Sequence, residues 1–214
     1  MRKTLCAAPT ALLAAILTVA PAFAGNPQTL KGTLNLDPAR TRIFFTLSGS
    51  LHTTEGTFQL KSGTISADPA TGEASGEIVI DANSANTDQS LRDAKMRDSV
   101  LETQRYPEIL FVPERVAGHE SSDGNFTARL TGLLRLHGAD HEIILEAAGR
   151  VVDDELTAST HFSVPYAAWG MTNPSILFLR VADTVEVNIV ASGKVAWSAQ
   201  KAPPAPSLPA SSKR

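Results

Sequence analysis

Hydrophobic and polar residues alternate with a period of two along most of this chain. The alternation is clearest over residues 43–47, 126–136, 156–164 and 185–189. Because neighbouring side chains of a strand point to opposite faces, each run predicts a strand with one buried and one wet face. We expect about eight to ten such strands in all.

Turn-forming residues separate these runs and keep the connections short. Residues 68–72 read Asp-Pro-Ala-Thr-Gly, and further tight connections are expected at 122–125, 137–141 and 153–154. Short connections favour antiparallel pairing, because parallel neighbours need long crossovers. A sheet of this size normally splits or closes, and closure removes its edges. The pattern therefore predicts an all-β, antiparallel barrel.

One segment departs from the strand pattern. Met96, Val100 and Leu101 recur at helical spacing within residues 89–101. Pro107 then stops the segment, because proline cannot continue a helix. The sequence predicts one short helical insert over 89–101, after which the chain returns to a strand.

Several positions predicted to face the interior are small, namely Ala128, Gly132, Ala147, Ala158 and Thr160. A barrel of about eight strands is either filled by side chains or holds one small ligand. Small interior residues favour a cavity, although packing of the helical insert over one mouth is another use for that space.

The first residues predict export. A basic start is followed by an apolar stretch over 11–20 and by Ala22-Phe23-Ala24, the pattern after which signal peptidase cuts. We expect residues 1–24 to be a signal peptide, cleaved after Ala24, and the mature protein to be periplasmic or secreted. The alternative is a membrane anchor that stays uncleaved, although the apolar stretch is short for a span.

Composition sets the remaining boundaries. Cys6 is the only cysteine and precedes the cleavage site, so the mature chain has no disulfide and no cysteine-bound metal. Residues 198–214 are rich in Pro, Ala and Ser, which predicts a disordered tail. One domain is therefore expected over residues 25–197.

The charge balance is acidic. The chain has 19 Lys and Arg against 22 Asp and Glu, a net charge of −3. Removing the leader takes away Arg2 and Lys3, which leaves 17 basic against 22 acidic residues and a net charge of −5. Such a balance does not favour nucleic acid or anionic lipid as a partner. No stretch of the mature chain is long and apolar enough to predict a transmembrane span.

Four motifs, in this order, resemble those of the YceI-like family. A turn leads into the first apolar strand at Asp37, Pro38, Ala39, Ile43, Phe45 and Leu47. A glycine and phenylalanine element follows at Gly56, Phe58 and Gly63. A helix-to-strand segment uses Arg92, Asp93, Tyr106, Pro107, Ile109 and Phe111. A hairpin uses Gly132, Leu134, Leu136, His137 and Gly138. The resemblance covers about residues 34–193.

The chain departs from that family at polar positions. Arg40-Thr41 stands where many members carry His-Ser, and Gly49 stands where a His often ends the first long strand. The family sequence Arg-Asp-x-His-Leu reads Arg-Asp-Ala-Lys-Met over residues 92–96. The segment 164–171 also replaces a late Arg before an Asp-Phe-Gly-like turn. These differences concern the recognition of a head group more than the fold.

The resemblance implies an extended lipocalin-like barrel with an apolar cavity for a polyisoprenoid or similar amphiphile, without catalysis. We expect such a protein to need no metal and no cofactor. The interior side chains expected to line the cavity are Ile43, Phe45, Leu47, Phe58, Ile78, Ile80, Ile109, Phe111, Leu130, Leu134, Phe162 and Val187. The alternative is that these residues pack against one another as an ordinary core.

Several polar and aromatic residues have two interpretations. Tyr166 and Trp169 could form an aromatic lip that contacts the ligand, or could pack together at a strand corner. Arg92-Asp93, with Lys95, could hold a polar head group, or could form a solvated helix face. We interpret the histidines as turn and surface residues rather than metal ligands; they are His52, His119, His137, His141 and His161.

The sequence therefore predicts an exported, non-enzymatic protein that sequesters or carries an isoprenoid-like lipid. One alternative is an enzyme that acts on the same lipid, and another is an envelope scaffold or stress-protective protein with a filled barrel. The ligand and the oligomeric state, a homodimer included, are left open.

Overall fold

The computed structural model describes residues 29–68, 70–120, 124–175 and 180–200. The predicted signal peptide, and residues 201–214 of the predicted tail, lie outside these ranges.

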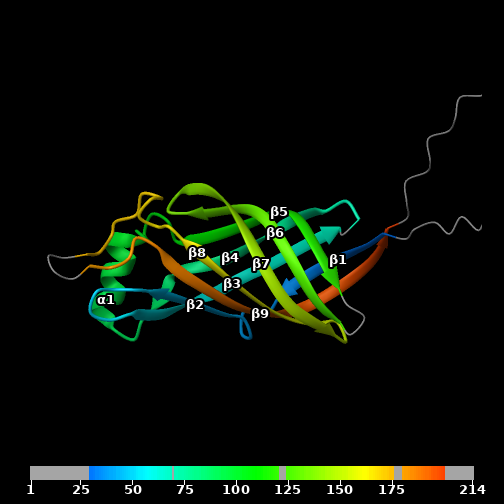
Figure 1. Ribbon diagram of the computed structural model, residues 1–214, viewed down its shortest axis with the longest axis horizontal. Coiled ribbons are helices and arrows are strands. Elements are labelled where there is room, and N and C mark those ends of the chain that lie inside the picture. The colour runs from blue at the N-terminus through cyan, green and yellow to red at the C-terminus, as the bar shows by residue number, and fades with distance from the viewer. Residues whose placement is uncertain (1–28, 69, 121–123, 176–179, 201–214) are drawn as a thin grey trace, which may run out of the picture.

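Nine strands and one short helix form the described chain (Figure 1). The strands are β1 (Thr29–Leu36), β2 (Arg42–Leu47), β3 (Thr54–Asp68), β4 (Glu73–Asn86), β5 (Glu108–Glu120), β6 (Asn125–Leu136), β7 (Ala139–Val152), β8 (Glu155–Val164) and β9 (Val185–Gln200). The helix α1 (Ser90–Lys95) continues directly into a π-helical turn, Met96–Val100. The predicted all-β class and the single short helical insert are confirmed.

The strands close into an antiparallel barrel. Their order is β1-β3-β2-β9-β8-β7-β6-β5-β4, and an additional pairing of β4 with β3 closes the sheet. β1 and β2 both lie between β3 and β9, at different levels. Leu34 of β1 faces Ile65 and Val195, whereas Phe45 of β2 faces Gly56 and Val187. The barrel therefore has eight strand positions, one of which two strands share.

The turn between β1 and β2 allows this sharing. The Asp37 carboxylate accepts a hydrogen bond from the Ala39 backbone N–H at 2.9 Å, which folds the Asp-Pro-Ala turn. The Asp37 N–H donates to the Ser192 carbonyl of β9 at 2.8 Å, and Thr41, on the far side of the turn, bonds the same residue. The chain thus leaves the sheet for only a few residues.

The last strand continues further than the sequence predicted. Ser198 pairs with Lys31, and β9 ends at Gln200, so residues 198–200 belong to the barrel and not to the tail. Backbone pairing with β1 needs no apolar side chain, which explains why the composition gave no signal here.

The barrel is filled at one end and hollow at the other. Buried Ile65, Leu156 and Val195 lie toward the end where the described chain begins and finishes. α1 lies at the opposite end of the elongated molecule (Figure 1). A helix over one end of a barrel can cover the interior without interrupting the strand pairing.

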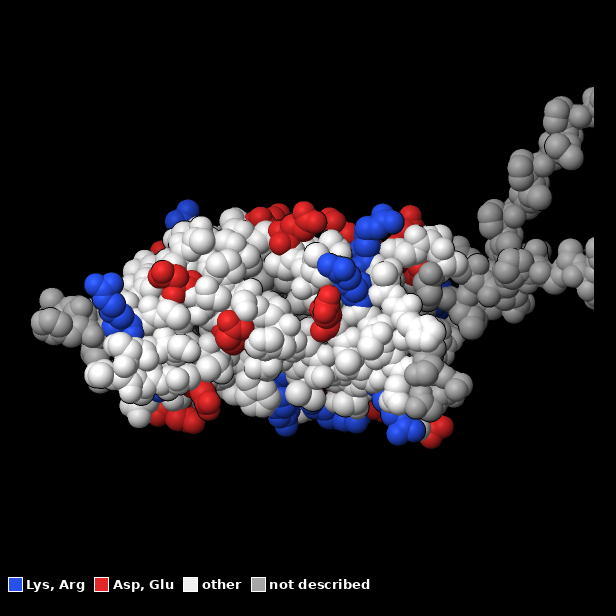
Figure 2. All heavy atoms as spheres, in the orientation of Figure 1, with Lys and Arg blue, Asp and Glu red and all other residues white. Residues whose placement is uncertain are grey.

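The surface carries charges of both signs. Figure 2 shows acidic and basic side chains mixed over the visible face, with no large area of one sign. No helix in the described part of the chain is long and apolar enough to cross a membrane.

Candidate functional site

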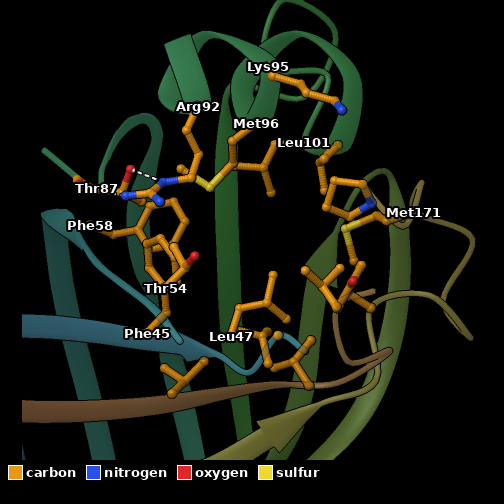
Figure 3. A pocket seen from close by; sticks show the side chains of 18 of the residues that line it. Phe45, Leu47, Thr54, Phe58, Thr87, Arg92, Lys95, Met96, Leu101 and Met171 are labelled. Atoms are coloured by element: carbon orange, nitrogen blue, oxygen red, sulfur yellow. Dashed lines mark hydrogen bonds between the residues drawn. The ribbon is translucent and has the colours of Figure 1, made fainter. Parts of the chain in front are cut away.

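A cavity of about 480 Å³ lies inside the barrel at the α1 end. Side chains from β2, β3, β4, β5, β6, β8, β9 and α1 surround it, and most of them are hydrophobic (Figure 3). The volume falls within the roughly 300–1,000 Å³ of typical small-molecule sites. The space could therefore hold an apolar ligand or part of a longer one.

Most of the residues that the sequence predicted for this role line the cavity. They are Ile43, Phe45, Leu47, Phe58, Ile80, Ile109, Leu134, Phe162, Tyr166 and Val187. The ring centroids of Phe45 and Phe58 are 5.2 Å apart. A Cβ at Gly56 would overlap the Phe45 ring, so a glycine there allows that ring to lie across β3.

Four predicted residues do not line the cavity. Phe111 is 4% exposed and belongs to a buried cluster with Leu134 and Leu145. Its ring lies over Gly132, where an added Cβ would approach it to 3.0 Å. Ile78 and Leu130 pack against this same cluster. The structure therefore places these three inside the barrel but outside the lining of the cavity.

Trp169 is the fourth. Its ring stacks on His141, with centroids 3.9 Å apart and planes inclined by 4°. Tyr166 lines the cavity but is only 5% exposed, and its hydroxyl donates to the Ala182 carbonyl at 2.7 Å. Burial raises the pKa of Tyr166 above its usual value, and the Asp183 carboxylate adds to this shift. The two rings therefore have different surroundings: Tyr166 borders the cavity, and Trp169 stacks on His141 outside its lining.

The small interior residues lie away from the cavity as well. Ala128, Ala147 and Thr160 border a second, more open and more polar depression over β5–β9. Gly132 is small because Phe111 and the β5 backbone approach it. The small size of these residues therefore does not mark the wall of the cavity beneath α1.

The helical insert covers the cavity, and it supplies lining residues that were not among the predicted site residues. Met96, Val100 and Leu101 line the cavity (Figure 3 shows Met96 and Leu101). Their helical spacing was the signal for this role, because such spacing places side chains on one face. The insert turns at Glu102, which has a φ of 49°, before it reaches Pro107.

Arg92 and Asp93 fasten this cover to the end of β4. Asp93 is 6% exposed, and its carboxylate accepts hydrogen bonds from the Thr87 backbone N–H at 2.9 Å and hydroxyl at 2.6 Å. The Arg92 guanidinium donates to the Thr87 hydroxyl at 2.7 Å and carbonyl at 2.9 Å (Figure 3). The solvated-face interpretation is wrong for Asp93, which is a buried anchor.

The charged side chains that contribute to the cavity lining are basic. Arg92, Lys95, Arg180 and His52 contribute to its lining, whereas no Asp or Glu among the described residues does so. The side chains of Lys95 and Arg180 make no hydrogen bond or ion pair with the described chain. The polar end of the cavity is thus positively charged.

The other histidines lie apart from one another. Nε2 of His137 is 3.4 Å from a Glu102 carboxylate oxygen, and His161 bonds Asn188 at 2.9 Å. His119 borders the depression over β5–β9. No group of three or more His, Cys, Asp or Glu in the described ranges could hold a metal ion.

Comparisons with known proteins agree with this architecture. The family model described as "YceI-like domain" matches residues 34–192. Two solved structures share the fold. Burkholderia cenocepacia BcnA is 17% identical with a TM-score of 0.58, and the match covers 75% of this chain and 99% of that one. A polyisoprenoid-binding domain from Saccharophagus degradans is 19% identical with a TM-score of 0.59, covering 76% and 98%. A search of curated proteins gave no match.

Proposed function

This chain belongs to the YceI-like domain family, and we propose on that basis that it binds an isoprenoid-like amphiphilic lipid inside its barrel. The observation that carries the proposal is the apolar cavity of about 480 Å³ beneath α1. A lipid tail needs only hydrophobic contact, and each buried CH₂ contributes about 0.8 kcal/mol. The solved domain from Saccharophagus degradans, whose name states that it binds polyisoprenoid, supports this class of ligand.

We propose that the protein sequesters or carries this lipid without changing it. The lining offers hydrophobic side chains and a few basic groups, which suit holding a tail and a polar head. The enzyme alternative is tested by incubating the lipid-loaded protein and extracting its ligand. Recovery of unchanged lipid is expected, whereas a product that accumulates only with the folded protein would establish turnover.

Export is a separate part of the proposal. We infer from the signal-peptide pattern over 1–24 that the mature chain begins at Gly25 and acts in the periplasm or outside the cell. Amino-terminal sequencing of the protein recovered from the cell envelope and medium tests this inference. A chain that retains Met1 would contradict it.

Native mass spectrometry tests the binding proposal. The protein is purified without detergent and measured intact, and its bound molecules are then extracted and identified. We expect one amphiphile with a long apolar tail per barrel. A wild-type protein that carries no lipid and cannot be loaded with geranylgeraniol would favour the scaffold alternative.

A further inference from the structure

Two leucines at the open end of the cavity are unusually exposed. Leu51 is 76% exposed and Leu91 is 88% exposed. Both contribute to the rim of the cavity. The other exposed large hydrophobic residues of the described chain are all less than half exposed, at 39–47%. Single exposed apolar residues are ordinary, but two that share one opening call for an explanation.

A basic side chain accompanies each leucine. Lys95 follows Leu91 by one helical turn on α1, so the two project from one side of that helix. Arg180 is joined to the loop of Leu51, because its carbonyl accepts the Ser50 N–H at 2.8 Å and Gly49 pairs with Val181. The two loops are therefore held together at the rim, and neither basic side chain has a partner in the described ranges.

We propose that this rim, defined as Leu51, Leu91, Lys95 and Arg180, docks on the surface of an anionic lipid bilayer. The leucines would enter the boundary between head groups and tails, and the two cations would lie against the lipid phosphates. The cavity opens within the rim, so a docked barrel presents its hollow end to the membrane. A tail could then pass between bilayer and cavity without crossing water.

The charge distribution favours this orientation and a weak attachment. The chain as a whole is acidic, whereas the rim has two free cations and the cavity lining has no carboxylate. An anionic surface would repel most of the molecule and attract the rim. Stable anchoring normally takes more than a few apolar and basic residues, so the docking is reversible, as a carrier requires.

Flotation with lipid vesicles tests the docking. Vesicles of phosphatidylcholine alone are compared with vesicles of equimolar phosphatidylcholine and phosphatidylglycerol. We expect the wild-type protein to bind the anionic vesicles, and less so as salt rises. The double variant Leu51→Glu/Leu91→Glu should lose about tenfold or more in affinity, and Lys95→Gln/Arg180→Gln about fivefold or more.

Two control variants lie elsewhere on the surface. Val152→Glu adds an acid at a half-exposed apolar position at the end of β7, and Lys194→Gln removes a cation on β9. Both should bind anionic vesicles within about twofold of wild type. Equal losses in the rim and control variants would overturn the proposal, as would a folded wild-type protein that ignores anionic vesicles.

The docking and the lipid-binding proposal can fail separately. Leu47→Trp, which should obstruct the cavity, is expected to float with anionic vesicles as wild type does. A protein that docks but carries no lipid would support the docking proposal and contradict the lipid-binding proposal. A protein that carries lipid but does not dock would support lipid binding and contradict docking.

Discussion

At the scale of single residues, the same alternation places side chains in two different environments. Leu47 on β2 borders the cavity. Phe111 on β5 also points inward, but it is 4% exposed and is packed against the Gly132 backbone. A larger side chain has room at the first position and none at the second.

Substitution by tryptophan distinguishes the two environments. Phe111→Trp should lower the free energy of unfolding by about 1–3 kcal/mol, because overpacking a filled core strains it. Leu47→Trp should change that free energy by less than about 1 kcal/mol, since the ring enters empty space. Urea denaturation of delipidated samples measures both, because bound lipid would itself stabilise the fold. A large loss in Leu47→Trp would mean that the cavity is closed in solution.

Tyr166 links stability to pH. Burial raises its pKa, so the folded state favours the neutral phenol. Its contribution to stability is complete below the pKa of an unfolded tyrosine, about 10, and is lost as pH rises through the folded value. Tyr166→Phe should cost about 1 kcal/mol near pH 8, because the Ala182 carbonyl loses its donor.

Above about pH 10, the free energy of unfolding of Tyr166→Phe should fall less with rising pH than that of the wild type. Denaturation midpoints at neutral and alkaline pH, compared between the two proteins, measure the difference. Parallel loss of stability in both proteins would show that Tyr166 is not the group responsible.

At the scale of elements, α1 with its π-helical turn is a cover attached at one edge. The Thr87, Arg92 and Asp93 network joins it to the end of β4, and the Arg97 guanidinium donates to the Ala85 carbonyl at 3.2 Å. A short helix has little stability of its own, so these polar contacts and the contact with the cavity wall hold it in place.

Removing the anchor should loosen this cover. Asp93→Ala leaves the Thr87 N–H and hydroxyl without their acceptor and should cost about 1–3 kcal/mol. Hydrogen exchange should accelerate over residues 90–101 more than in β6 or β7. Asp98→Ala, an exposed change on the same insert, is the control and should stay within about 0.5 kcal/mol of wild type. Uniformly faster exchange across the barrel would contradict a local role for Asp93.

The sequence predicted the secondary-structure elements correctly. It did not predict how far along the barrel axis each inward-facing residue lies. Alternation correctly placed Ile78 and Ile80 on one inner face, yet only Ile80 reaches the cavity. Leu130 and Leu134 differ in the same way. A period of two specifies the face of a strand and carries no information on depth. Depth depends on the register of every neighbouring strand, which a single sequence does not reveal.

The insert shows the same limit. Its helix was predictable from spacing, but the burial of Asp93 was not, since an acidic residue near a helix start usually faces water. Met96 and Leu101 were recognisable as an apolar face, and only the barrel shows that this face meets a cavity. Both the burial of Asp93 and the position of this apolar face depend on contacts between segments that are distant in the sequence.

At the scale of the whole molecule, two features underlie the proposed function: the barrel is closed, and its packed end is separate from its hollow end. The β3–β4 pairing closes the barrel, so the interior is shielded from water by a continuous wall. Packed residues fill one end, and the other end keeps about 480 Å³ open beneath α1. A stable fold and a space for a ligand can coexist because they occupy different ends.

The central claim is that this space binds the tail of an isoprenoid-like lipid. The most direct measurement is a titration of delipidated wild-type protein and Leu47→Trp with geranylgeraniol, followed by the thermal midpoint. Saturation at one lipid per barrel should raise the wild-type stability by about 2.7 kcal/mol when free lipid is 100 times the dissociation constant. Leu47→Trp should show little or no rise. An unchanged wild-type midpoint, or equal rises in both proteins, would contradict the account.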